Sequence, residues 1–172
     1  EGSIEVIDNG IGMELKTVQT VWMEPATPSK RDKPRSNKFK RRHLGEKGIG
    51  RFASSKLADE LEVISRCENT SSEVYAIFDW RQFEDDSKFL DEIIVLWESR
   101  APEEIKAGGA IESIWNSENK CPAPAQLDHG TVLRMTGLKQ KWEAGHFADL
   151  RRGLARLIAP KANQKEAFQI EL

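Results

Sequence analysis

Residues 6–14 read VIDNGIGME, and the fold assignment of the whole chain depends on this stretch. Asp8 directly follows a short apolar run, and Gly10 and Gly12 follow it at intervals of two. One explanation is a hairpin turn, because Asn-Gly after a strand is a common signal for one. The other is that the Asp8 carboxylate accepts a hydrogen bond from a ligand, while the two glycines keep side chains out of a pocket.

Composition places the chain among folded single domains. It has 172 residues, of which 38% are hydrophobic and 31% charged, so we expect one domain over residues 1–172. No apolar run approaches the roughly 18 to 20 residues of a membrane span. Cys67 and Cys121 are isolated, which argues against a disulfide framework or a structural zinc site. No secretory signal is visible, although the chain begins without a methionine, and we expect a cytoplasmic protein.

Charge is distributed unevenly along the chain. Residues 30–42 contain eight Lys or Arg and one acid, Asp32, although the whole chain has a net charge of −2. Such a block is usually a solvated loop, and it can also contact phosphate or nucleic acid. Pro25, Pro28 and Pro34 prevent a continuous helix here, so 24–44 is expected to be a long loop.

Hydrophobic periodicity predicts an α/β chain with more strands than helices. Short alternating or apolar runs predict strands, and apolar residues at helical spacing predict helices. The expected strands are 3–7, 61–66, 73–80, 91–99, 131–138 and 167–172; the expected helices are 14–23, 48–60 and 143–158; 110–115 fits either, and 116–130 is a loop. Tight turns favour antiparallel pairing, so we predict a two-layer sandwich in which a mixed, mainly antiparallel sheet is backed by helices. The amphipathic helix 143–158 is expected to pack on that sheet.

A second glycine cluster, GEKGIGRF at residues 45–52, precedes the predicted helix 48–60. A helix start offers unpaired N–H groups and the positive end of the helix dipole, and glycines let the backbone approach an anion, so this loop can hold phosphate. The GKS or GKT of a Walker loop is absent. A Rossmann fingerprint is also unsuitable, because its glycines would directly follow a strand.

Together these motifs resemble the Bergerat-fold ATPases, the GHKL family that includes DNA gyrase B, the ninety-kilodalton heat-shock chaperone, histidine kinases and MutL. DNGIGM is similar to the family's second motif, GEKGIGRF to its third and GTVLRM (130–135) to its fourth. The segment PSK (28–30) and the form of the phosphate loop resemble the chaperone, MutL and MORC branch. The resemblance implies a Bergerat ATP-binding fold in which 24–47 forms the lid over ATP.

The resemblance also implies roles for individual residues. Asp8, a buried carboxylate in this interpretation, would accept a hydrogen bond from the adenine amino group. Gly12 would let the base lie close to the backbone, and Met13 would pack against its ring. Thr131 would reach the adenine edge through a bridging water. The implied cofactor-binding set is Asp8, Gly10, Gly12, Met13, Lys30, Gly45, Lys47, Gly48, Ile49, Gly50 and Thr131, with Lys30 and Lys47 neutralising phosphate charge.

The chain departs from the family in one respect. The family's first motif, a helix before the DxGxG strand, carries an asparagine that binds Mg²⁺ and, in hydrolysing members, a glutamate that is the general base. Only one strand precedes DNGIGM here, so we expect no catalytic residue or metal ligand within these 172 residues, weak nucleotide binding and poor hydrolysis. The general base is expected upstream of Glu1.

Three readings of the function follow from these motifs. One is an ATP-driven conformational switch, with ATP, ADP and Mg²⁺ as ligands and a nucleotide-dependent homodimer or other domains of the same protein as partners. The second is a pseudo-ATPase scaffold. The third is a MutL- or gyrase-like module whose basic loop contacts nucleic acid. No membrane partner is expected.

Overall fold

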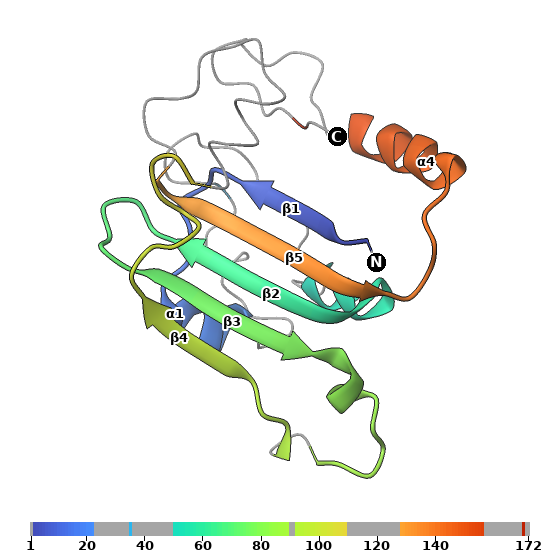
Figure 1. Cartoon of the computed structure of the whole chain (residues 1–172), viewed down its shortest axis with the longest axis horizontal. Coiled ribbons are helices and arrows are strands. Elements are labelled where there is room, and N and C mark those ends of the chain that lie inside the picture. The colour runs from blue at the N-terminus through green and yellow to red at the C-terminus, as the bar shows by residue number, and fades with distance from the viewer. Residues whose placement is uncertain are drawn as a thin grey trace.

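The computed structural model describes residues 2–22, 35, 50–89, 92–109, 128–156 and 170. Five strands form one sheet in the order β1-β5-β2-β3-β4, and each pairing within it is antiparallel (Figure 1). Their bounds are β1 Ile4–Asp8, β2 Ala58–Arg66, β3 Glu73–Asp79, β4 Leu96–Arg100 and β5 Gly130–Leu138. The last of the described strands, β5, therefore lies between the first and the second. This sheet with few helices confirms the predicted α/β class and is consistent with the Bergerat fold.

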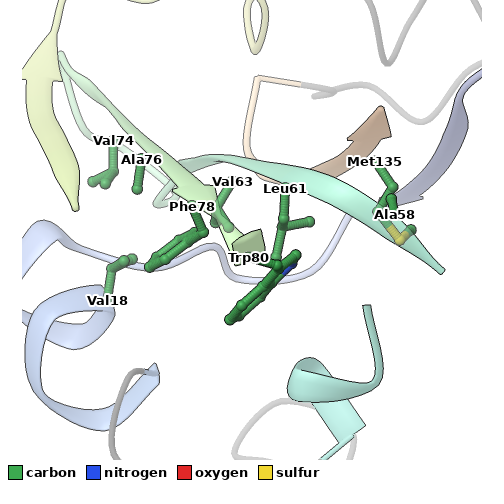
Figure 2. Close-up of a cluster of buried hydrophobic side chains, with 9 residues drawn as sticks. All are labelled: Val18, Ala58, Leu61, Val63, Val74, Ala76, Phe78, Trp80 and Met135. Carbon is green, nitrogen blue, oxygen red and sulfur yellow. The ribbon is translucent and has the colours of Figure 1, made fainter. Parts of the chain in front are cut away.

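One face of the sheet, here called the inner face, carries short helices and the main core. The α-helical turn α1 (Leu15–Thr17) continues into a π-helical turn, η1 (Val18–Trp22), and a 3₁₀ helix, η2 (Gly50–Lys56), lies on the same side (Figure 1). Nine buried residues form this core: Val18, Ala58, Leu61, Val63, Val74, Ala76, Phe78, Trp80 and Met135 (Figure 2). Burying a large apolar side chain contributes about 1.5–3 kcal/mol. Because strand side chains alternate between faces, the core fixes which residues of each strand face inward.

The opposite, outer face is held by a smaller apolar cluster and by ion pairs. Ile64, Val132 and Ile105 are fully buried together. The carboxylate of Glu73, also fully buried, accepts hydrogen bonds from Arg100 Nε at 3.0 Å and from the backbone N–H of Ile105 at 3.0 Å. These bonds pin the segment after β4 against the sheet. Burial would raise the pKa of Glu73, but its hydrogen bonds outweigh burial and lower that pKa.

Several element boundaries differ from those predicted. Gly50–Lys56 is a short 3₁₀ helix rather than the start of a helix extending to residue 60, because β2 already begins at Ala58. Phe52 and Leu57 pack against the main core. The strand predicted at 91–99 is β4, which begins only at Leu96 and leaves Ile94 71% exposed. A local apolar run thus predicted a strand correctly but could not locate where its pairing with β3 starts.

The predicted packing of the C-terminal amphipathic helix is wrong for the residues described. Helix α4 (Ala144–Ala155), predicted as 143–158, has no buried residue, and Phe147 is 49% exposed. It stands off the β1 edge of the sheet (Figure 1). Its nearest aromatic contact is local, with the Phe147 ring 5.5 Å from that of Trp142. Helical periodicity predicted the helix correctly but not the surface that it covers.

Other predictions fall outside the described residues. They are the lid at 24–47 apart from Arg35, the segment 110–115, most of the loop 116–130 and the strand 167–172 apart from Ile170. Within the described part of the chain, no helix is long and apolar enough to cross a membrane.

Candidate functional site

Asp8 is the last residue of β1, and its carboxylate shapes the loop that follows. Its Oδ1 accepts a hydrogen bond from the backbone N–H of Gly10 at 2.8 Å, which folds Asp8–Gly10 into an Asx turn. A Cβ on Gly10 would lie 2.6 Å from that Oδ1, so a side chain there would displace the carboxylate. The hairpin interpretation of Asn9-Gly10 is wrong, because β1 pairs with the distant β5 and not with the next strand.

Two further glycines let the chain close around this turn. Gly12 has a φ of +70°, and a Cβ there would lie 1.9 Å from the carbonyl oxygen of Arg66 at the end of β2. Gly130 has a φ of +141°, and a Cβ there would lie 2.1 Å from the carbonyl oxygen of Asp8. These conformations strongly favour glycine. Glycine is therefore favoured at position 12 because the loop approaches β2 closely, which the sequence motif did not reveal.

Asp8, Thr131 and Ser65 form a polar row across three neighbouring strands. Thr131 of β5 lies directly opposite Asp8 of β1 on one side and Ser65 of β2 on the other. Side chains an even number of residues apart along a strand lie on the same face of the sheet. Thr131 and Ser65 are each two residues, and Asp8 is four residues, from a residue that contacts the main core. All three side chains therefore face the helices. Directly opposite Cβ atoms are typically about 4.5–5.5 Å apart, so one small ligand can contact neighbouring members of this row.

The polar row grades from exposed to buried. Asp8 is exposed rather than buried, contrary to prediction, whereas Thr131 is 7% exposed and Ser65 is fully buried. Partial desolvation still raises the pKa of Asp8, against the hydrogen bond from Gly10 and the charge of His129, which both lower it. The row thus presents one accessible carboxylate beside an enclosed hydroxyl.

Ser65 and His129 were missed as site residues. Ser65 Oγ accepts the Met13 backbone N–H at 2.8 Å and lies 2.9 Å from Thr131 Oγ1. His129 Nδ1 lies 2.6 Å from the carbonyl oxygen of Gly10, although sequence alone suggested an ordinary loop residue. A polar residue at an inward position of the apolar run 61–66 was the available signal for Ser65, and none marked His129.

A groove of about 340 Å³ lies beside this row, between the start of α1 and the turn joining β2 to β3. It is lined by Met13, Glu14, Leu15, Lys16, Cys67, Thr70, Ser72, Val74 and Ser99. Of the predicted site residues it includes Met13 but neither Asp8 nor Thr131, so the groove does not coincide with the polar row. Met13 connects the two, because it lines the groove and its backbone N–H donates to Ser65. Burial and the neighbouring charge of Glu14 raise the pKa of the Cys67 thiol, which keeps it protonated.

The predicted phosphate half of the site is not described. Lys30, Gly45, Lys47, Gly48 and Ile49 lie outside the described residues, and Gly50 is the first residue of η2. The structure therefore brings together Asp8, Gly10, Gly12, Met13 and Thr131, around the end of β1.

The catalytic half of the site also stays a prediction. No structural observation tests it, and Glu1 itself lies outside the described residues, which begin at Gly2. The described geometry therefore covers the predicted site residues around the end of β1, and the predicted phosphate loop stays a prediction from the sequence.

Comparison with known proteins gives one family. A family model described as "Histidine kinase-, DNA gyrase B-, and HSP90-like ATPase" matches residues 1–108, well over half of the chain. A search of the curated proteins finds no match. Strand β5 lies beyond the matched residues, yet it pairs with both β1 and β2 inside them.

Proposed function

Because this chain belongs to the family of histidine kinase-, DNA gyrase B- and HSP90-like ATPases, we propose that it is an ATP-binding domain that acts as an ATP-driven conformational switch. The family implies nucleotide binding. The proposal goes further in assigning the purine to the polar row of Asp8 and Thr131 on the inner face.

The observation that carries the proposal is the placement of Asp8 opposite Thr131. Adenine presents an amino donor beside a ring acceptor, N1, and the pair offers a charged acceptor beside a hydroxyl. Guanine presents a carbonyl in place of the amino group, which an ionised Asp8 would repel. A hydrogen bond to a charged group contributes about 1.5–3 kcal/mol, enough to favour adenine at this position.

The phosphate half of the proposal rests on the sequence. Gly45 and Gly48 precede η2 in the sequence and Gly50 is its first residue, and backbone N–H groups at a helix start suit a phosphate chain. Lys30 and Lys47 are assigned to phosphate charge on the same basis. Met13 is assigned to the purine ring, because its backbone is fixed by Ser65 and it borders the groove.

The family also implies Mg²⁺, which would travel with the triphosphate. Magnesium usually takes one or two carboxylates and several phosphate or water oxygens. In the described residues, no three His, Cys, Asp or Glu side chains gather as metal ligands.

The test of the purine assignment is Asp8→Asn, measured by calorimetry with ATP. We expect ATP binding to be lost, because the amide cannot supply a charged acceptor for the adenine amino group. Asp85→Asn is a matched control, since Asp85 Oδ1 also accepts the backbone N–H two residues later, from Ser87 at 3.0 Å. Equal affinity in the wild type and Asp8→Asn would remove Asp8 from the site.

The switch part of the proposal is tested separately. Residues 30–42 hold eight Lys or Arg, so a bound triphosphate would attract this segment electrostatically. We expect a non-hydrolysable ATP analogue to slow trypsin cleavage within 30–42, while ADP has a smaller effect because it lacks the γ-phosphate. Cleavage that is the same with and without the analogue, at saturating concentration, would reject the switch and leave nucleotide binding standing.

A further inference from the structure

Strand β4 (Leu96–Arg100) forms one edge of the sheet, and its side chains are largely uncovered. Among the described strands it pairs with β3 alone, so alternate backbone N–H and C=O groups along it point away from the sheet (Figure 1). Each of its first four residues is exposed, whereas no residue of the neighbouring β3 is. An uncovered edge of this kind is a template on which another extended segment can pair.

Large apolar side chains lie on both faces of this edge. Trp97 is directly opposite the buried Ala76, so it belongs to the inner face, and it is 40% exposed. Leu96 belongs to the outer face and is 62% exposed, and Ile94, just before the strand, is also exposed. Adjoining exposed apolar residues mark an interaction surface, unlike apolar residues scattered singly. The edge therefore offers apolar contact in addition to backbone pairing.

The charge around the edge indicates which partner it fits. Residues 84–103 contain seven Asp or Glu and only two Lys or Arg. Arg100 Nε is already engaged with the buried Glu73 at 3.0 Å, whereas the side chains of Glu98 and Glu103 are more than half exposed. An antiparallel pairing with a second copy of this chain, centred on β4, would place the two Glu98 carboxylates directly opposite each other, which is destabilising. A basic segment meets no such repulsion.

We propose that β4 is a docking edge for an extended segment of a partner protein in which basic and apolar residues alternate. The segment adds a further strand to the sheet, with its basic side chains on the outer face beside Glu98 and its apolar side chains on the inner face beside Trp97. Alternation is the pattern that meets both, because successive strand side chains point to opposite faces. This inference concerns the edge of the sheet away from Asp8, and it does not rest on the proposed function.

The experiment measures, by calorimetry, the binding of three synthetic hexapeptides to the 172-residue chain. One alternates valine with lysine, one alternates valine with glutamate, and one has its three valines and three lysines in two separate blocks. We expect the alternating lysine peptide to bind about tenfold more tightly than either of the others, which corresponds to about 1.4 kcal/mol. The glutamate peptide is repelled by the acidic edge, and the block peptide cannot place all its lysines on one face.

Backbone pairing is tested with two N-methylated versions of the alternating lysine peptide. N-methylation of every second residue removes the N–H donors on one side of an extended strand and leaves those on the other. We expect one version to bind about tenfold more weakly than the other, because only one side of the peptide faces β4. Equal affinities of the two versions would overturn strand addition.

Two substitutions place the peptide on this edge. We expect Glu98→Lys to weaken binding of the alternating lysine peptide about tenfold and to strengthen binding of the glutamate peptide, because it reverses the charge opposite both. Trp97→Ala should weaken both peptides and keep their order. Asp149→Lys is the matched control, since Asp149 is an exposed carboxylate on α4, beyond the opposite edge of the sheet (Figure 1). It should bind both peptides as the wild type does.

Several outcomes would reject the docking edge. Equal binding of the three peptides by the wild type would do so, as would an affinity for the alternating lysine peptide that Glu98→Lys leaves unchanged. Should Glu98→Lys fail to fold by circular dichroism, Glu98→Gln tests the same point, with an expected weakening of about threefold. A wild type that dimerises in analytical ultracentrifugation, and that Glu98→Lys or Trp97→Ala makes monomeric, would assign the edge to a second copy and overturn the proposal.

Discussion

Gly12 occupies a backbone conformation and a space that no other residue fits without moving the chain. Its φ is +70°, and a Cβ would overlap the carbonyl of Arg66 at 1.9 Å. We expect Gly12→Ala to lower the free energy of unfolding by about 3 kcal/mol or more, since left-handed strain alone costs about 1–2 kcal/mol. Urea denaturation followed by circular dichroism measures this change.

A glycine without these constraints provides the control for that substitution. Gly145, in the first turn of α4, has open space within 4 Å of the position that a Cβ would occupy. Gly145→Ala should leave the urea midpoint unchanged or raise it slightly, because alanine is the better helix former. Similar losses in the two variants would show that the close approach of Gly12 to β2 does not matter for stability.

The ionised Asp8 carboxylate is expected to lower the free energy of unfolding at neutral pH. Its pKa is raised above the ordinary 3.8, chiefly by desolvation. A raised folded-state pKa means that the folded state holds the proton more tightly than the unfolded state. Protonated Asp8 therefore contributes its full stabilisation of the folded state below the ordinary pKa. This contribution is lost as the pH rises through the pKa that Asp8 has in the folded state. At pH 7 the ionised carboxylate is consequently unfavourable for folding.

Asp8→Asn should accordingly raise the urea midpoint at pH 7, and the gain should shrink as the pH falls toward the ordinary pKa of 3.8. The amide oxygen can still accept the Gly10 N–H, so the turn is kept. Asp85→Asn is again the matched control, with the opposite sign, because hydrogen bonds from Ser87 lower the pKa of Asp85. A lower midpoint for Asp8→Asn at pH 7 would contradict the prediction.

For individual residues, the sequence motif predicted part of the site, and the other site residues were identified only from contacts in the structure. The DxGxG spacing singled out Asp8, and its resemblance to a known family linked Asp8 with Thr131, which the strand register places opposite each other. The inward polar position marked Ser65 but did not assign it a role, because one serine in an apolar strand has the same pattern whether it is an isolated polar residue of the core or joins several hydrogen bonds. His129 could not be predicted as a site residue either, because its contact is with Gly10, which is 119 residues away in the chain.

Among the elements, α4 shows most clearly where periodicity stops being informative. The spacing of Phe147, Leu150 and Leu154 predicts a helix with one apolar face, and the helix is present. The same spacing suits a helix that packs on its own sheet and one that packs elsewhere. Strand β4 is similar, since the apolar residues before Leu96 resemble a strand but extend past the end of its pairing with β3.

The stability contribution of α4 should be small. Leu150 is 37% exposed, whereas Leu61 in β2 is 1% exposed and lies in the main core. We expect Leu150→Ala to lower the free energy of unfolding by less than about 1 kcal/mol, and Leu61→Ala by about 2–5 kcal/mol. Urea denaturation of the two variants side by side makes the comparison. Equal losses would show that α4 is part of the cooperative core.

For the molecule as a whole, the decisive feature is the insertion of β5 between β1 and β2. Local patterns located the five strands approximately, but they contain no information on which strands are neighbours. The pairing of Asp8 with Thr131 joins positions that are 123 residues apart in the chain. Contacts of this kind close long loops, so the chain gains them only when most of the sheet has formed.

A chain cut after Gly108 keeps β1 to β4 but should not form this sheet. In the described residues β1 pairs with β5 alone, and β2 would lose its neighbour on that side. The inner face would then expose Leu61 and Val63, and the polar row would keep Asp8 and Ser65 without Thr131 between them. We expect fragment 1–108 to lack a cooperative urea transition and to bind no ATP, whereas the 172-residue chain unfolds in one transition. Adding fragment 109–172 in trans is expected to restore part of the signal, because it returns β5. A cooperative transition in fragment 1–108 alone, with ATP affinity equal to that of the full chain, would mean that β5 is dispensable to both the sheet and the site.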